Sequence, residues 1–147
     1  MKTAIAYYSQ HHGNTKKLLD AIQAADENVT LIDVTEKHEV DLNSYDRIGF
    51  ASGIYYSSFA KQVLNFASVN LPTQKDVFFI ATCGAPRKSY FNAIRQVIKD
   101  KQCKEIGSHL CLGFDTFGPF KLVGGIQKGH PTDEEIQAAV EFYQELK

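Results

Sequence analysis

Five short, apolar, β-rich runs recur along this chain, and they constrain its fold more than any other feature. They lie at residues 3–8, 29–34, 47–52, 77–82 and 106–114. Apolar residues at helical spacing separate these runs. Strands that alternate with helices imply a parallel sheet with right-handed connections, covered by helices on both of its faces. The sequence therefore predicts an α/β fold with a five-stranded parallel sheet and helices on both faces.

Four helices are expected from the same patterns. Apolar side chains at helical spacing mark residues 18–22, 59–67 and 91–98. The last helix is expected to begin at Thr132, because Thr132-Asp133-Glu134-Glu135 has the form of a capping box. Residues 35–46 carry a poor helical signal, so we expect a loop or one short helix there.

Length, charge and cysteine content narrow the class of protein. A chain of 147 residues is expected to form one domain, spanning 1–147. The formal net charge of -1 argues against nucleic acid or an anionic membrane surface as partner, because both attract clustered Lys and Arg. No apolar run is long enough to span a bilayer, and Met1 leads directly into a strand, so a cytoplasmic protein is expected. Cys83, Cys103 and Cys111 contain no CxxC pair, which fits reduced thiols.

A polar loop follows the first strand run and leads into the first helix. Its residues are Ser9, Gln10, His11, His12, Gly13, Asn14 and Thr15. The first N–H groups of a helix lack partners and carry a partial positive charge, so this junction suits a phosphate. Lys16 and Lys17 add positive charge nearby. The alternative is that the loop only caps its helix and that the histidines are solvated.

Two further loops follow the third and fourth runs, at the same edge of the expected sheet. The first contains Ser52, Gly53, Ile54, Tyr55 and Tyr56, and the second contains Thr82, Cys83, Gly84, Ala85 and Arg87. Small residues let backbone amides approach a ring, and aromatic or apolar side chains pack on its faces. Together with a phosphate loop, these segments predict a site for a mononucleotide with a flat ring. The alternatives are tyrosines at the rim, a solvated Arg87, and Cys83 as either a redox-active thiol or a small apolar wall.

In these segments the chain resembles the flavodoxin family, over essentially its whole length. Gly13-Asn14-Thr15 is similar to the end of the family's FMN-phosphate loop, although His11-His12 adds an apparent extra residue. Residues 45–56 are similar to the third strand and flavin loop of flavodoxin-domain proteins, including relatives of menaquinone-linked protoporphyrinogen oxidases. Residues 113–131 resemble a short-chain bacterial branch. The resemblance implies strand order 2-1-3-4-5 and non-covalently bound FMN, held by the three loops described above.

Other kinds of binding or catalytic site that occur in α/β folds are not expected here, because the sequence lacks their motifs. The chain has no GxGxxG for a dinucleotide, and residues 124–129 do not complete a Walker loop. A cysteine phosphatase loop needs Arg six residues after Cys83, where Ser89 stands. The histidines show no metal-ligand spacing, so no metal is expected. The chemistry requires neither a general base nor a nucleophile, so no catalytic side chain is assigned.

The resemblance leaves more than one function open. The first is electron transfer through the bound flavin to a redox partner protein. The alternative is an FMN-dependent oxidoreductase acting on a quinone, a porphyrinogen or another small-molecule electron acceptor. A third is an FMN-binding sensor without turnover. The near-neutral charge predicts weak electrostatic steering toward a partner, and we expect a monomer or a weak homodimer.

Residues 115–131 form an unusually long connection before the last helix. Connections in such folds usually run about 2 to 6 residues, so one of this length is more often functional or disordered. Its apolar side chains argue against disorder. We hypothesise that it folds over the carboxyl edge of the sheet, and the alternative is that it only covers an edge strand.

Overall fold

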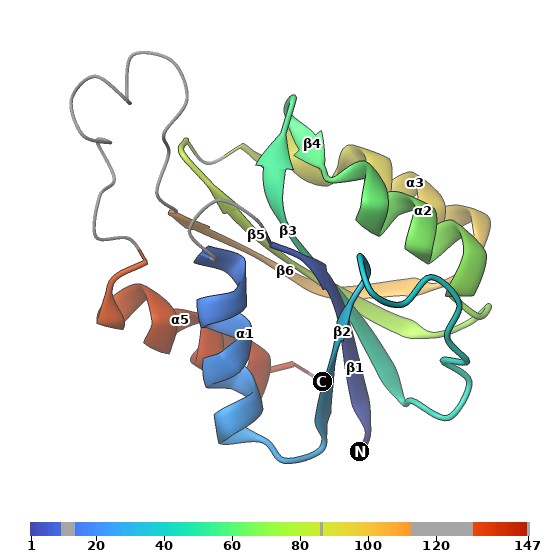
Figure 1. Cartoon of the computed structure of the whole chain (residues 1–147), viewed down its shortest axis with the longest axis horizontal. Coiled ribbons are helices and arrows are strands. Elements are labelled where there is room, and N and C mark those ends of the chain that lie inside the picture. Colours follow the sequence, from blue (N-terminus) through green and yellow to red (C-terminus); the bar gives the residue numbers. More distant parts are fainter. Residues whose placement is uncertain (10–13, 86, 113–130, 147) are drawn as a thin grey trace.

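The fold is a parallel sheet between two layers of helices, and the computed structural model describes residues 1–9, 14–85, 87–112 and 131–146 (Figure 1). The strands are β1 (Thr3–Tyr8), β2 (Val29–Asp33), β3 (Arg47–Tyr55), β4 (Ser58–Phe59), β5 (Asp76–Cys83) and β6 (Lys104–Leu112). The helices are α1 (Asn14–Ala25), α2 (Lys61–Asn70), α3 (Asn92–Asp100) and α5 (Asp133–Gln144), with a 3-10 turn, η1, at Lys88–Phe91. Figure 1 shows α1 and α5 on one face of the sheet and α2 and α3 on the other.

The predicted strand order is confirmed, with one added element. The parallel strands run β2-β1-β3-β5-β6, which is order 2-1-3-4-5 when only these five strands are counted. The sequence reasoning missed β4, a short strand that pairs antiparallel with the end of β3. Because of this pairing, β3 extends to Tyr55 instead of ending at Ser52, and Phe59 lies in β4 instead of opening a helix.

The helix predictions are confirmed with small corrections at their ends. Phe91 closes η1 and precedes α3, so it does not belong to the third helix itself. The capping box is present: the Glu135 N–H donates to Thr132 Oγ1 (3.1 Å), and the Thr132 N–H donates to Glu135 Oε1 (2.9 Å). Residues 35–46 form turns without a helix. The last strand runs over 104–112, and residues 113–114 of the prediction lie outside the described residues.

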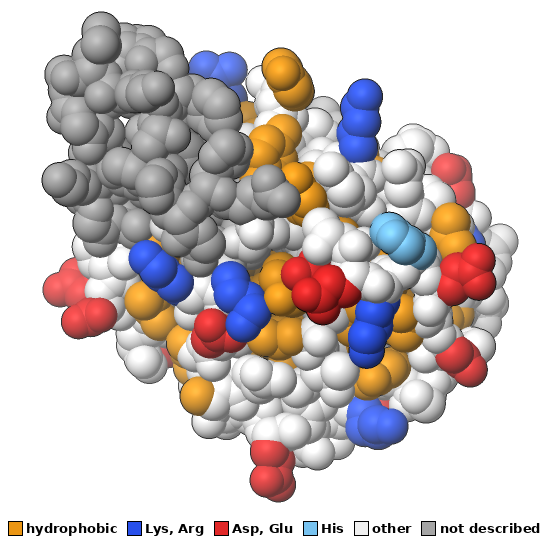
Figure 2. Space-filling view, viewed as in Figure 1, with side chains coloured by type: hydrophobic (Ala, Val, Ile, Leu, Met, Phe, Trp, Pro, Cys, Tyr) orange, Lys and Arg blue, Asp and Glu red, His pale blue; other side chains and the backbone are white. Residues whose placement is uncertain are grey.

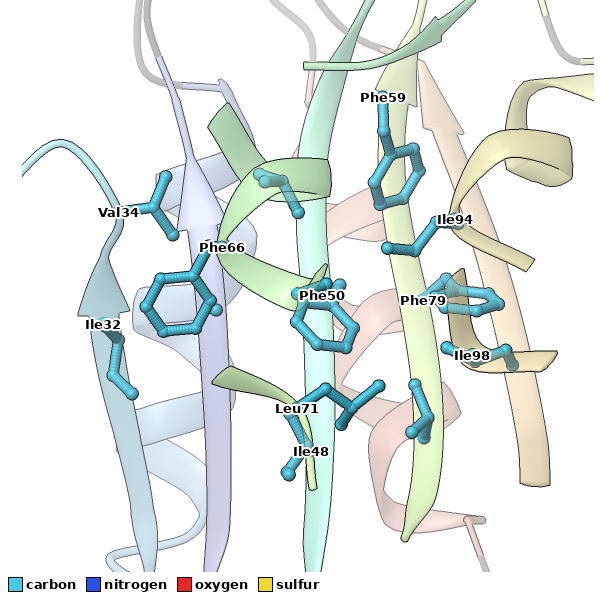
Figure 3. Packing of buried hydrophobic residues seen from close by; sticks show 14 of the residues in the cluster. Ile32, Val34, Ile48, Phe50, Phe59, Phe66, Leu71, Phe79, Ile94 and Ile98 are labelled. Carbon is cyan, nitrogen blue, oxygen red and sulfur yellow. The ribbon is translucent and has the colours of Figure 1, made fainter. Parts of the chain in front are cut away.

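The core has two parts, one on each face of the sheet, as a buried parallel sheet requires. Figure 3 shows the part beneath α2 and α3, where Phe50 and Phe79 of the sheet face Phe66, Ile94 and Ile98 of the helices. The opposite part gathers side chains of α1 and α5 over the strands; its members include Ile5, Leu18, Leu19, Ile22, Phe78, Ile80, Ala139 and Tyr143. Both faces of the central strands are therefore shielded from water.

Gly49 is a point of close approach within this core. It pairs with Phe78 across β3 and β5, and a Cβ at Gly49 would lie 2.4 Å from Cζ of the Phe78 ring. The Phe78 ring is itself fully buried and packs edge-on against Phe142 and Tyr143 of α5. The ring therefore has little room to move away from an added methyl group.

We predict that Gly49→Ala lowers the free energy of unfolding by about 1–3 kcal/mol, because the added methyl group overpacks a rigid site. Urea denaturation measures the effect. Phe78→Leu supplies the control: in its background, Gly49→Ala should cost much less, because the atoms that the methyl group meets are gone. An unchanged midpoint for Gly49→Ala in the otherwise native chain would contradict the packing argument.

Candidate functional site

Three strand ends meet at one edge of the sheet. Tyr8 at the end of β1 lies opposite Ser52 of β3, and Gly53 lies opposite Thr82 of β5. Parallel strands in this register bring the segments that follow β1, β3 and β5 together. Figure 1 shows that α1 begins at the same edge. The described parts of the three loops that the sequence singles out therefore share one location.

The start of α1 is tied to the end of β5. Asn14 and Thr15 are buried although they are polar, with exposed fractions of 6% and 2%. Thr15 Oγ1 lies 2.9 Å from Thr82 Oγ1, within hydrogen-bond distance. The Lys16 N–H donates to Ser9 Oγ (3.3 Å), so Ser9 satisfies one first-turn N–H of the helix. Four further predicted residues, Gln10, His11, His12 and Gly13, lie outside the described residues.

The side chain of Lys16 turns toward its own helix. Its ammonium pairs with Asp20 one turn later and lies 6.0 Å from the centre of the Tyr7 ring. The hydrogen bond to Asp20 raises the pKa of Lys16 above its ordinary value. Lys17 is exposed. Lys16 is therefore partly neutralised, and the helix N-terminus contributes positive potential at this junction.

The β3–β4 hairpin turns through two residues in the left-handed backbone region. Tyr55 pairs with Ser58 across the turn, and between them Tyr56 has φ 51° and Ser57 has φ 63°. Turns of this kind favour Asn-Gly, because L side chains cost roughly 1–2 kcal/mol per residue in this region. The side chain of Tyr56 is fully exposed. The turn thus holds an aromatic ring in solvent at the cost of backbone strain.

Ser52, one of the predicted cofactor-binding residues, uses its hydroxyl in hydrogen bonds within the protein. Ser52 is fully buried, and its hydroxyl accepts the Ala60 N–H (3.0 Å) and also contacts the Gly53 carbonyl. Ser52 therefore braces the hairpin against the start of α2. A Cβ at Gly53 would lie 3.3 Å from the Tyr55 hydroxyl, so this glycine permits close approach of the ring.

Two tyrosines that the sequence reasoning missed support the predicted loops. Tyr8 meets Tyr55 edge to face, with ring centres 5.7 Å apart. Tyr90 donates its hydroxyl proton to the Ala85 carbonyl (2.7 Å) and so braces the segment after β5. The position of Tyr8 at the very end of the first strand was an available signal. Tyr90 offered none, because its role depends on a loop contact.

At the end of β5, Cys83 is a buried thiol and Arg87 is exposed. The Cys83 thiol donates toward the Cys111 carbonyl, with sulfur and oxygen 3.7 Å apart. Burial raises the pKa of Cys83 to about 11. Since the thiolate is the reactive form, the thiol is unreactive at neutral pH. This favours the interpretation of Cys83 as a small apolar wall.

A pocket opens beside the hairpin, with a volume of about 460 Å³. Its lining residues are Tyr8, Tyr55, Tyr56, Ser58, Phe59, Ala60, Lys61, Gln62 and Leu64. Aromatic rings dominate one end of this wall, and the start of α2 forms the other. Ser58 Oγ is buried and has no hydrogen-bond partner among the described residues. The volume lies in the range of about 300–1,000 Å³ that is usual for small-molecule sites.

Comparison with known proteins identifies the family. A family model for the flavodoxin domain matches residues 4–113. An uncharacterized protein of Methanocaldococcus jannaschii is 36% identical over 145 residues, covering 97% of this chain and 95% of the relative. The flavodoxin of Streptococcus pneumoniae TIGR4 has a similar structure, with TM-score 0.64, 14% identity, and coverage of 98% of this chain and 97% of that one. A flavoprotein of Lactobacillus acidophilus NCFM, crystallised with FMN, matches with TM-score 0.56 and 20% identity over 74% of this chain and 92% of that one.

The chain therefore belongs to the flavodoxin-domain family, as the resemblance in its sequence predicts. Family membership supports FMN as the cofactor. Within the described residues, none of the helices combines the length and the apolar character needed to cross a bilayer. The same residues contain no cluster of three metal-ligating side chains.

We predict that Ser57→Gly raises the free energy of unfolding by up to about 1 kcal/mol, because glycine adopts positive φ without the steric cost of a side chain. Thermal or urea unfolding measures the change. Ser58→Gly is the matched control, since Ser58 lies in extended backbone and glycine should cost about 0.5–1 kcal/mol there. Equal destabilisation by both variants would show that the turn is not strained.

Proposed function

We propose that this protein binds FMN at the shared edge of β1, β3 and β5 and uses it for electron transfer. The observation that carries the proposal is the convergence of three loops, pinned by the contact between Thr15 and Thr82. The residue types present fit the group. Polar residues lie at the start of a helix, as a phosphate needs, and small and aromatic residues lie in the neighbouring loops, as a flat ring needs.

The phosphate would lie at the N-terminus of α1. Ser9, Asn14 and Thr15 bring polar side chains to this end of the helix, and Gln10, His11, His12 and Gly13 complete the loop in sequence. The aligned peptide dipoles favour an anion at this end without a direct lysine contact. This arrangement agrees with Lys16 being paired to Asp20.

The flavin ring would lie between the β3–β4 hairpin and the segment after β5. Gly53, Ile54, Tyr55 and Tyr56 would line one side, and Thr82, Cys83, Gly84, Ala85 and Arg87 the other. Bound FMN supplies the electron chemistry. The protein tunes it through backbone dipoles at the ring edge and through the apolar surroundings, to which the protonated Cys83 thiol contributes. Ser52 acts indirectly, by fixing the hairpin to α2.

The surface charge argues for partners that do not depend on strong steering. In Figure 2, basic and acidic side chains are interspersed over the visible face and do not gather by sign. A net charge of -1 produces a weak long-range field. Docking on a redox partner would therefore depend on short-range complementarity.

A second candidate is an FMN-dependent oxidoreductase acting on a small molecule. The pocket of about 460 Å³ beside the hairpin favours it, because Tyr8, Tyr55 and Tyr56 offer aromatic faces to a planar substrate. A quinone or a porphyrinogen has the required shape.

We predict that FMN binds at least about a hundredfold more tightly than riboflavin, because each charge-assisted hydrogen bond to the phosphate contributes about 1.5–3 kcal/mol. Calorimetry with both flavins measures this difference. Thr15→Val should weaken FMN binding about tenfold and leave riboflavin binding unchanged. Thr82→Val is the matched control, since it breaks the same Thr15–Thr82 contact but keeps the Thr15 hydroxyl; because Thr82 lies on the ring side of the site, its effect should be equal for FMN and riboflavin. Equal binding of the two flavins would remove the phosphate site.

Stepwise anaerobic reduction of the FMN-loaded protein, followed by absorbance, tests the redox role. We expect a one-electron-reduced state to accumulate near half reduction, because a carrier passes electrons singly between proteins. Direct conversion to the fully reduced form, together with rapid turnover on quinones, would contradict the electron-carrier role and support the function of a small-molecule oxidoreductase.

A further inference from the structure

Helix α2 presents an unusual surface. Its solvent face, which we call the α2 face, consists of Lys61, Gln62, Asn65, Ser68 and Val69. Lys61 is the one charged residue in the helix, whereas α1, α3 and α5 each carry at least three. Val69 is 64% exposed. Depletion of charge is typical of the centre of a protein interface.

Two hollows flank this face and share Gln62. One is the pocket beside the hairpin, and the other, of about 400 Å³, lies between α2 and the loop after β2. The second hollow is mostly apolar, and its lining residues are Val34, Thr35, His38, Gln62, Asn65, Phe66 and Val69. We call these two hollows together the groove; Tyr56 lines the first of them and Val69 lines the second, and both side chains are exposed.

The two ends of the groove differ in charge. Lys61 and the positive N-terminus of α2 lie at the hairpin end. Residues 38–40 lie at the other end, because the Asn70 side chain donates to the His38 carbonyl (2.8 Å) and accepts the Val40 N–H (2.9 Å). The loop that contains them, residues 35–41, begins beside the second hollow, which Thr35 lines. This loop carries three acidic residues, at 36, 39 and 41, and one lysine at 37. The ten residues of α2 separate the two ends by about 15 Å.

We infer that the α2 face is the contact surface of a homodimer with a twofold axis. When two α2 helices lie antiparallel, each copy's Lys61 end meets the acidic loop of the other copy. The same rotation brings the projecting Tyr56 of each copy to the apolar hollow at the other copy's Val69 end. Twofold interfaces require such self-complementarity, with the same pairs formed twice. The occupant is therefore a second copy of this chain, and the inference does not rest on the redox role proposed above.

Exposed tyrosines of this kind supply much of the binding energy in protein interfaces, because they bury a large area with little loss of conformational freedom. Tyr56 makes no packing contact that covers its ring in the single chain, since its exposed fraction is 103%. A strained turn that holds such a ring in water is explained if one part of the ring is covered by the flavin proposed above and the rest is covered on association.

Sedimentation velocity on the FMN-loaded protein over a concentration series tests the inference. We expect reversible dimers, and Val69→Glu should raise the dissociation constant about tenfold or more, because it buries an unpaired charge. Lys61→Glu should weaken the dimer less, and the added substitutions Glu36→Lys and Glu39→Lys should restore it. Both Val69 and Lys61 are exposed in the single chain, so the variants should keep the native fold, as circular dichroism will verify.

Ala138→Glu is the matched control, because it places the same charge on an exposed position of α5, away from the α2 face. It should leave the dissociation constant unchanged. A monomer at every concentration would overturn the inference. So would a dimer that Val69→Glu and Lys61→Glu leave intact, since its contact surface would then lie elsewhere.

Discussion

The in-register parallel pairing of β1, β3 and β5 is the constraint on which the other features of the site depend. It brings Tyr8 beside Ser52 and Gly53 beside Thr82, so the strand ends that lead into three separate loops lie at one edge. Parallel strands require crossover helices on both faces, and the crossover after β1 also delivers the N-terminus of α1 to that edge. The contact between the hydroxyls of Thr15 and Thr82 then fixes this helix end against β5.

The β3–β4 hairpin shows how the same framework tolerates local strain. Ser52 is held on both sides by strand pairing, and its hydroxyl fixes the Ala60 N–H at the start of α2. The hairpin is therefore closed at its base by bonds that do not involve the turn. The turn residues, Tyr56 and Ser57, can adopt positive φ because the surrounding structure leaves them no alternative. Strain of this kind is most often retained where a side chain must be presented to a ligand or a partner.

Periodic apolar patterns were sufficient to predict a parallel sheet and the main helices, because burial on both faces requires them. The strand order was predicted only by the resemblance to the flavodoxin family, and the structure confirms it. The capping box at Thr132 could also be predicted from the sequence, because its two hydrogen bonds join residues that are three positions apart. The hairpin was not predictable: Tyr56-Ser57 lacks the Asn or Gly that signals such a turn. For the site, the sequence identified the loops but could not show that Ser52 is used as a brace, because its partner is eight residues away. Residues 115–131 lie almost wholly outside the described residues, so the hypothesis for that loop stays a prediction.

The hairpin belongs both to the proposed flavin site and to the proposed dimer contact, and this has a thermodynamic consequence. Tyr55 and Ser58 pair within the same two-stranded unit that projects Tyr56, so a shift of the turn reaches the pocket wall directly. If FMN binding alters the hairpin, it must alter the dimer affinity by the same factor by which dimerisation alters FMN affinity, because linkage between two binding events is reciprocal. A neutral chain without long-range steering would gain specificity from such short-range coupling. Dimer formation and FMN binding would then change each other's affinity through the strained turn at Tyr56 and Ser57.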